Sequence, residues 1–171
     1  MNLSFPTSGN VISPFGVSRG GGSRSHEGID ISATKGQPIY AAAAGRVFKA
    51  GWISSGAGLG VEIDHGGGAV TKYFHCQQVF VSVGQQVAQG AQIASADNTG
   101  NAANTVTHLH FEYWQSGRAV DPVPYFSSGA ILPSLSGQTF APITQALSES
   151  SFNLPLVLGA LFFVAVIRRL R

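Results

Sequence analysis

The sequence predicts a mainly β fold, an antiparallel sheet, and three observations support that prediction. The chain of 171 residues contains 22 glycines but only 11% charged residues, a composition that argues against a helical bundle. Short segments alternate apolar and polar residues with partial period two, as strands do. Glycine-containing turns separate these segments. The length suits one domain with a small appendage, and we place the domain at residues 1–126.

The expected strands follow one another along this domain. They lie at 38–52, 59–68, 69–79, 91–96 and 107–114. The second and third are expected to pair as a hairpin, because the glycines of the turn sequence HGGG tolerate positive φ. An extended, proline-bearing stretch, QSGRAVDPVPYF, then closes the domain.

Two segments follow the domain. Residues 127–151 are rich in Ser, Gly, Pro, Thr and Ala without a clear period, and we expect a linker there. Residues 152–171 begin with an apolar run and end with arginines. A helix over 152–167 would be roughly 24 Å long, against a bilayer core of about 30 Å, and snorkelling arginines could extend it. We expect a C-terminal transmembrane helix, with a buried helix as the alternative.

Charge and cysteine content exclude several classes of protein. The net charge of +2 depends on three arginines in the last four residues, since residues 1–153 hold seven basic and eight acidic residues. No basic patch is evident, so no nucleic-acid partner is expected. The single cysteine, Cys76, excludes an intrachain disulfide and is expected to be a packed residue. The N-terminal stretch MNLSFPTSGNVISPFG has neither the basic nor the apolar region of a secretory signal.

A pair of histidines stands in the stretch THLHFEY. Side chains at positions i and i+2 of a strand point to the same face, so His108 and His110 are expected to project together. The apolar residues Leu109 and Phe111 then pack on the opposite face. Two imidazoles about 6–7 Å apart can serve one metal site, one as a ligand and the other just beyond the ligand shell.

A second constellation stands in SRSHEGIDIS. In an extended chain, His26, Gly28 and Asp30 share a face, and the missing side chain of the glycine is expected to leave an open gap between the other two. An imidazole and a carboxylate suit Zn²⁺. With one histidine of the HxH pair they would supply three protein ligands and leave a fourth position for water, the pattern of a catalytic zinc site.

Further titratable residues lie on or beside the expected strands. His75 ends a strand in TKYFHC, where it could reach the same site and exchange a proton. His65, before the glycine turn, is expected to be a turn or hydrogen-bonding residue. The carboxylates Glu62, Asp64 and Glu112 are expected on solvated faces.

Four stretches together resemble a known family. HEGIDISATKGQPIYAAAAGRV, HGGGAVTKYFHC, VSVGQQVAQGAQIASADNTG and THLHFEYWQSGRAVDPVPYF are similar, in this order, to the M23 peptidases, the lysostaphin and LytM type of zinc endopeptidase. The resemblance covers residues 12–126. It implies a mostly antiparallel sheet with a groove over one Zn²⁺. It implies that His26, Asp30 and His110 bind the zinc and that His75 and His108 are the catalytic pair.

The resemblance also implies a function. We expect hydrolysis of peptide bonds in bacterial peptidoglycan, in which zinc polarises the scissile carbonyl and activates water, and the two catalytic histidines orient that water, stabilise the oxyanion or shuttle its proton. The alternative is a catalytically inactive peptidoglycan-binding or regulatory module of the same fold. Retention of all five site residues favours the enzyme.

The expected location depends on the C-terminal segment. Basic residues after an apolar segment favour the cytoplasmic side, which would leave the domain outside. Without a secretory signal, however, export of the domain needs another route. We therefore expect attachment to a membrane through the C-terminus, either in the virion of a phage with an internal membrane or in the bacterial cell envelope.

Overall fold

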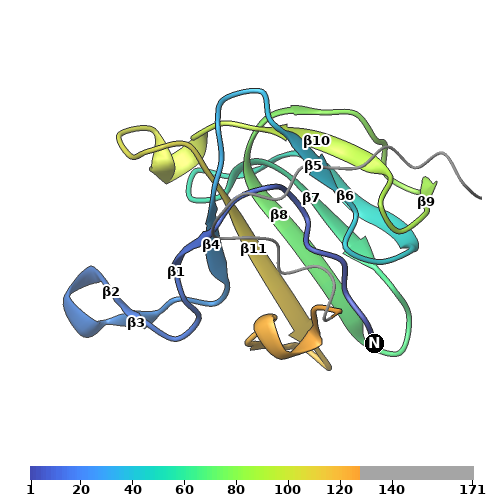
Figure 1. Cartoon of the computed structure of the whole chain (residues 1–171), viewed down its shortest axis with the longest axis horizontal. Helices are drawn as coiled ribbons and strands as arrows, with labels where there is room; N and C mark the ends of the chain where they lie inside the picture. The colour runs from blue at the N-terminus through green and yellow to red at the C-terminus, as the bar shows by residue number, and fades with distance from the viewer. Residues whose placement is uncertain (128–171) are drawn as a thin grey trace, which may run out of the picture. The chain divides into compact units, whose positions relative to one another are not determined.

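The computed structural model describes residues 1–127, and strands dominate this part of the chain (Figure 1). The strands are β1 (Val11–Ser13), β2 (Ser18–Arg19), β3 (Arg24–Ser25), β4 (Ile29–Ser32), β5 (Pro38–Tyr40), β6 (Gly45–Ser54), β7 (Gly58–Asp64), β8 (Ala69–Val79), β9 (Gln86–Val87), β10 (Gln92–Ala96), β11 (His108–Gln115) and β12 (Arg118–Val120). Three short 3₁₀ helices, η1 (Gly20–Gly22), η2 (Gly100–Ala102) and η3 (Val123–Tyr125), lie between or after them.

One ten-stranded sheet contains all of these strands except β2 and β3. Its main order is β1-β4-β11-β8-β7-β6-β9, and every pairing between its strands is antiparallel. Strand β10 pairs with β5 and β8, and β12 pairs with β11. The β2–β3 hairpin stands beside β1 (Figure 1). Strand β11, which holds the HxH pair, therefore lies between two strands that precede it in sequence.

Strand β8 changes partner part-way along its length. Its first half pairs with β11 as far as Phe74, opposite His110. Its second half pairs with β10 from Cys76 onward, opposite Ala96. His75, at the change, has φ of 64°, in the left-handed region that residues other than glycine rarely occupy.

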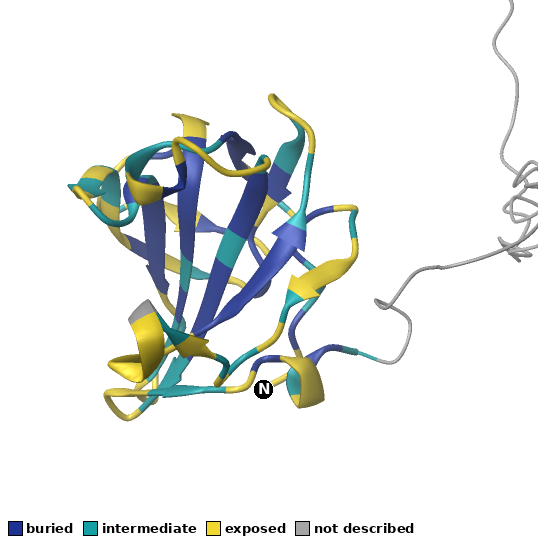
Figure 2. Cartoon of the chain, turned by 90° about the vertical axis from the view of Figure 1, so that its left-hand side faces the viewer, coloured by how far each residue is buried: buried dark blue, intermediate teal, exposed yellow. Residues whose placement is uncertain are grey.

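The core lies on one face of the central strands. The largest fully buried side chains are Tyr73, Tyr113, Phe111, Leu3, Ile29, Ile31, Ile39, Ile63, Ile93, Leu109, Val47 and Val61. On β4 and β11 they alternate with polar residues, because neighbouring side chains of a strand point to opposite faces. Figure 2 shows the buried strands in the middle of the sheet and exposed residues mainly in the loops.

The mainly β, antiparallel prediction is confirmed, with one difference in the strands. The expected hairpin of β7 and β8 forms, and its glycines at 66–68 have φ between 61° and 80°. The segment expected as one strand at 38–52 forms β5 and β6 instead, because the small residues Ala41–Ala43 between them are buried in the core. Nothing within residues 1–127 forms a helix long and apolar enough to cross a membrane. The linker predicted at 127–151, after its first residue, and the apolar segment at 152–171 lie outside the described residues.

Candidate metal centre and its surroundings

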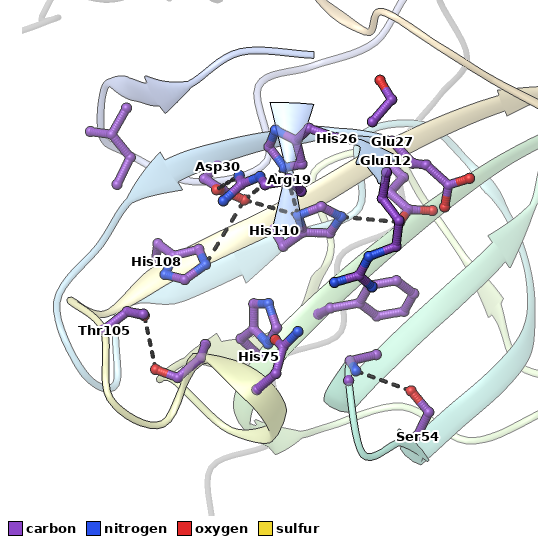
Figure 3. A pocket seen from close by; sticks show the side chains of 18 of the residues that line it. Arg19, His26, Glu27, Asp30, Ser54, His75, Thr105, His108, His110 and Glu112 are labelled. Atoms are coloured by element: carbon purple, nitrogen blue, oxygen red, sulfur yellow. Dashed lines mark hydrogen bonds and ion pairs between the residues drawn. The ribbon is translucent and has the colours of Figure 1, made fainter. Parts of the chain in front are cut away.

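Three of the predicted site residues meet on the face of the sheet opposite the core (Figure 3). Asp30 on β4 faces His110 on β11, and the two are directly paired in the sheet. Asp30 Oδ1 lies 2.9 Å from His110 Nδ1 and 3.1 Å from His26 Nε2. The two ring nitrogens are 3.1 Å apart. We call His26, Asp30 and His110 the ligand trio.

Each histidine of the trio has its far nitrogen bound to an oxygen. His26 donates from Nδ1 to the carbonyl of Pro14 at 2.8 Å, so Nε2 faces the trio. His110 donates from Nε2 to Glu112 Oε1 at 3.0 Å, so Nδ1 faces the trio. Such outer partners fix the tautomer and the ring orientation of metal-binding histidines. Two nitrogens and one carboxylate oxygen converging in this way suit Zn²⁺.

Asp30 is held from its other side by Arg19. Arg19 donates to Asp30 Oδ2 at 2.6 Å and to Ser13 Oγ at 2.9 Å. Burial alone would raise the pKa of the Asp30 carboxyl, but hydrogen bonds from His110, His26 and Arg19 outweigh burial and lower that pKa well below its ordinary value. Asp30 is therefore ionised near neutral pH, and Oδ1 is available as an anionic ligand atom.

The pKa of His110 is raised, whereas that of Asp30 is lowered. Burial lowers its pKa, but hydrogen bonds to Asp30 and Glu112 and the charges of these two carboxylates raise it to about 9. An imidazolium between two carboxylates is stable because both ring nitrogens can donate at once. A metal ion at the trio would take the place of the proton on Nδ1.

The two other predicted histidines lie beside the trio. The rings of His75 and His108 have centroids 5.0 Å apart, and His108 Nε2 lies 3.9 Å from Asp30 Oδ1. His75 donates from Nδ1 to the carbonyl of Thr99, and His108 does the same to Val106, each at 2.8 Å. Both rings thus keep Nε2 free. Burial lowers the pKa of His75 to about 4, so this ring is neutral at pH 7.

Gly28 brings the strands that hold the trio close together. A Cβ at this position would lie 2.2 Å from the carbonyl oxygen of Phe111 and 3.0 Å from Cγ of Glu112. The prediction of an open gap beside Gly28 is therefore wrong, because the backbone of β11 fills that space. The missing side chain permits this close approach of β4 to β11.

The ligand trio, together with His75 and His108, lines a cavity of about 820 Å³. It is lined by the N-terminal segment with β1–β4, by the β6–β7 turn, by the loop that contains η2, and by strands β8 and β11. All five predicted site residues therefore line it.

The structure brings together the five predicted site residues, and it adds two that the sequence interpretation missed. Arg19 was not singled out, and Glu112 was expected on a solvated face. Glu112 is 5% exposed and Glu62 is 4% exposed, so that expectation is wrong for both. The signal for Glu112 was its position, two residues after His110 on one face of the same strand. Asp64 is exposed and Cys76 buried, as expected.

Comparison with known proteins identifies the family. The profile of peptidase family M23 matches residues 24–122, a range that includes every residue of the trio and both neighbouring histidines. The chain belongs to peptidase family M23. The family match and the antiparallel fold agree with the resemblance inferred from the sequence motifs.

Several bacterial proteins are similar in sequence to this M23 chain. The chain is 40% identical over 121 residues to "Murein hydrolase activator NlpD" of Escherichia coli, covering 71% of this chain and 30% of that protein. It is 41% identical to "Outer membrane antigenic lipoprotein B" of Haemophilus influenzae, covering 71% and 28%. The matched region thus spans less than a third of the length of these relatives.

Solved structures of two peptidases share the fold. A zinc-containing peptidase from Vibrio cholerae superposes with a TM-score of 0.64 at 29% identity, covering 71% of this chain and 39% of that one. The catalytic domain of lysostaphin from Staphylococcus simulans superposes with a TM-score of 0.58 at 30% identity, covering 68% and 89%.

Proposed function

We propose that this M23 protein is a zinc-dependent endopeptidase that hydrolyses peptide bonds in bacterial peptidoglycan. The observation that supports the proposal is the arrangement of the trio with two further histidines. The atoms of His26, Asp30 and His110 that could bind one ion lie within 4.8 Å of one another. His75 and His108 lie beside them in the same cavity. A purely structural zinc site would have four protein ligands and no need of free imidazoles.

The trio fits zinc by the chemistry of its donors. His26 Nε2, Asp30 Oδ1 and His110 Nδ1 would hold the ion, and Arg19 and Glu112 would orient two of these ligands from behind. Bound zinc would supply Lewis acidity, which polarises a carbonyl and lowers the pKa of water.

The neighbouring histidines would handle protons and orient the reacting groups. His75 is neutral at pH 7 and its Nδ1 is bound to Thr99, so Nε2 can accept a proton from a water in the cavity. His108 presents Nε2 near Asp30 and can hydrogen-bond to the scissile carbonyl or return the proton to the leaving amine.

The proposal is tested by digesting purified sacculi with the zinc-loaded chain and reading new amino termini by mass spectrometry. We expect new termini that disappear with a chelator. His108→Ala should lose activity but keep stoichiometric zinc, whereas His110→Ala should lose both. The opposite pattern of zinc retention would reverse the ligand assignment. Absence of new termini from several cell-wall types would contradict the proposed activity.

A regulatory role is the second candidate, because one relative is named as a murein hydrolase activator. In that case the chain would bind sacculi and zinc without cutting, and would raise the release of wall fragments by an added hydrolase. The same digestion with and without that hydrolase separates the two roles. The five intact site residues favour direct hydrolysis.

We propose the bacterial cell envelope as the place of action. The names of the relatives include outer-membrane and lipoprotein components, and peptidoglycan lies in that compartment. Packaging in a phage virion remains the alternative, and attachment through residues 152–171 remains a prediction. Immunodetection in purified virions would support the phage alternative, whereas detection only in bacterial envelopes would contradict it.

A further inference from the structure

Two arginines face each other across the β2–β3 hairpin beside the trio. Arg19 and Arg24 are directly opposite in the antiparallel ladder, so both side chains leave the same face of the hairpin. Like charges directly opposite destabilise a strand pair. Both arginines line the cavity. An unfavourable local pairing at the edge of a site suggests that the charges serve a ligand.

The two arginines differ in their contacts. Arg19 is engaged by Asp30 and Ser13. The guanidinium of Arg24 is exposed and has no hydrogen bond or ion pair to any other residue in the described part of the chain. Arg24 therefore keeps all five N–H donors for a ligand in the cavity.

The position of Arg24 relative to the trio follows from the hairpin. Pairing continues past β3, since the His26 amide donates to the Val17 carbonyl at 2.9 Å. Arg24 and His26 are two residues apart in this extended segment, so they share a face and their Cα atoms lie about 6–7 Å apart. An anion on Arg24 would thus lie about one or two peptide residues from the trio.

Nearby acidic groups do not neutralise Arg24. Asp30 is paired with Arg19, and Glu112 is paired with Lys72 at 3.1 Å and with His110. Glu27 is exposed and forms no ion pair within residues 1–127. Glu27 also lines the cavity, but in this extended segment its side chain leaves the opposite face from Arg24 and His26. Arg24 therefore presents an unpaired guanidinium beside the place where a peptide bond would be cut.

We propose that Arg24 forms a subsite for a free carboxylate on the substrate, one or two residues from the scissile bond. This inference rests on the proposed function and narrows its substrate class to anionic peptides. Guanidinium and carboxylate match in geometry and charge, and their hydrogen bonds are among the stronger ones in proteins. A neutral peptide, such as a glycine bridge, would leave Arg24 without its partner.

The test uses the full zinc-loaded chain and one pool of soluble cross-linked wall peptides. Half of the pool keeps its carboxylates free, and in the other half carbodiimide and ammonia convert them to amides. We expect amidation to raise KM about tenfold for the natural chain with little change in kcat. Arg24→Gln should raise KM about tenfold on free peptides and remove the discrimination, whereas Arg24→Lys should keep part of it. Arg118→Gln, an exposed arginine on β12, should behave like the natural chain.

Each outcome decides a separate point. Equal KM on free and amidated peptides, or unchanged discrimination in Arg24→Gln, would overturn the carboxylate subsite while the hydrolase stands. If neither pool is cut, the proposed hydrolase fails, and calorimetric binding of the same two pools still tests the subsite. Tighter binding of the free pool that Arg24→Gln abolishes would support it, and equal binding would overturn it.

Discussion

Glu112 is a buried carboxylate that fixes the orientation of the His110 ring. It accepts hydrogen bonds from His110 and Trp114 and forms an ion pair with Lys72, whose Nζ lies 3.6 Å from the centroid of the Trp114 ring. Burial would raise the pKa of Glu112, but these partners lower it, beginning with His110. The carboxylate therefore stays ionised and holds the ring of His110 in one orientation.

Replacing this carboxylate should weaken metal binding without unfolding the protein. We expect Glu112→Gln to lower the affinity for zinc by about 10–100-fold, because the orienting charge behind His110 is lost. The matched control is Glu62→Gln, since Glu62 is also buried but pairs with Lys49 rather than with a histidine. Competition with a chromophoric chelator measures both. Equal losses in the two variants would contradict a role specific to His110.

Zinc binding should depend on pH through His110. Its pKa of about 9 in the metal-free site means that a proton must leave Nδ1 before an ion can bind. Affinity should therefore rise by about tenfold per pH unit between about 6.5 and 9 and then level off. Titrations at several pH values in two buffers of different ionisation enthalpy would show one proton released. An affinity that is flat over this range would contradict the prediction.

The stability of the metal-free protein should fall as the pH rises, whereas its affinity for zinc should increase. A pKa raised from 6.5 to about 9 in the folded state means that the folded protein binds more protons in this window. The stabilisation from His110 is then fully present below about pH 6.5 and is lost as the pH rises through about 9. The melting temperature of the chelated protein should fall over this range. A melting temperature that rises instead would show that other groups dominate.

Sequence reasoning reached the site residues through strand geometry. Alternation placed His108 and His110 on one face of a strand and His26 and Asp30 on one face of an extended segment, and the family resemblance implied that the two segments share a site. The structure brings them together. Their catalytic and metal-binding roles stay predictions. Arg19 could not be placed, because its contact with Asp30 depends on how the hairpin folds back.

At the scale of elements, the change of partner in β8 places His75. The strand leaves β11 at Phe74 and joins β10 at Cys76, and the residue between them has positive φ. Such a conformation costs roughly 1–2 kcal/mol in a residue with a Cβ. Strain of this kind is concentrated at functional sites. Here it accompanies the turn of the His75 ring toward His108.

The strained conformation of His75 predicts that glycine is more stable than alanine at this position, the reverse of the usual order in a strand. His75→Gly should be more stable than His75→Ala by about 1 kcal/mol, because only alanine keeps the Cβ that the left-handed region disfavours. At Gln78, an exposed position of β8 without positive φ, glycine should be less stable than alanine by about 0.5–1 kcal/mol. Urea unfolding of the four variants measures both differences. The same order at both positions would contradict strain at His75.

Elements whose signals are local were the ones the sequence could predict. The glycine turn fixed the β7–β8 hairpin, and alternation identified β11. The division of 38–52 into two strands could not be predicted, because Ala41–Ala43 have no side-chain pattern that distinguishes a buried connection from a strand. The partner change of β8 likewise depends on β10, which comes later in the chain.

At the scale of the whole molecule, the two ends of the described part are fastened together. Leu3 and Phe126 form a parallel bridge, and both are buried. The Leu3 amide donates to the Tyr125 carbonyl at 2.8 Å, and the Ser127 amide donates to the Leu3 carbonyl at 3.0 Å. The described part of the chain is therefore closed at Ser127, and all five predicted site residues lie before that residue.

A chain cut after Ser127 should keep its fold and its metal site. We expect the melting temperature of residues 1–127 to match that of the full chain, with zinc bound one to one. A chain cut after Asp121 should lose about 3 kcal/mol or more, because Phe126 leaves the core. If residues 152–171 are a membrane anchor, only the full chain should need detergent. Precipitation of the 1–127 chain would contradict a self-contained domain.

The central place of β11 also has a consequence for the newly made chain. A nascent polypeptide that has reached η2 already contains His26 and Asp30, but it lacks the strand that belongs between β4 and β8. Folding must therefore wait for contacts between residues far apart in sequence, which makes it slow compared with helical proteins. The three proposed zinc ligands therefore come together only when the sheet is complete, and a chain that ends before β11 lacks the site at which we propose that a peptide is cut.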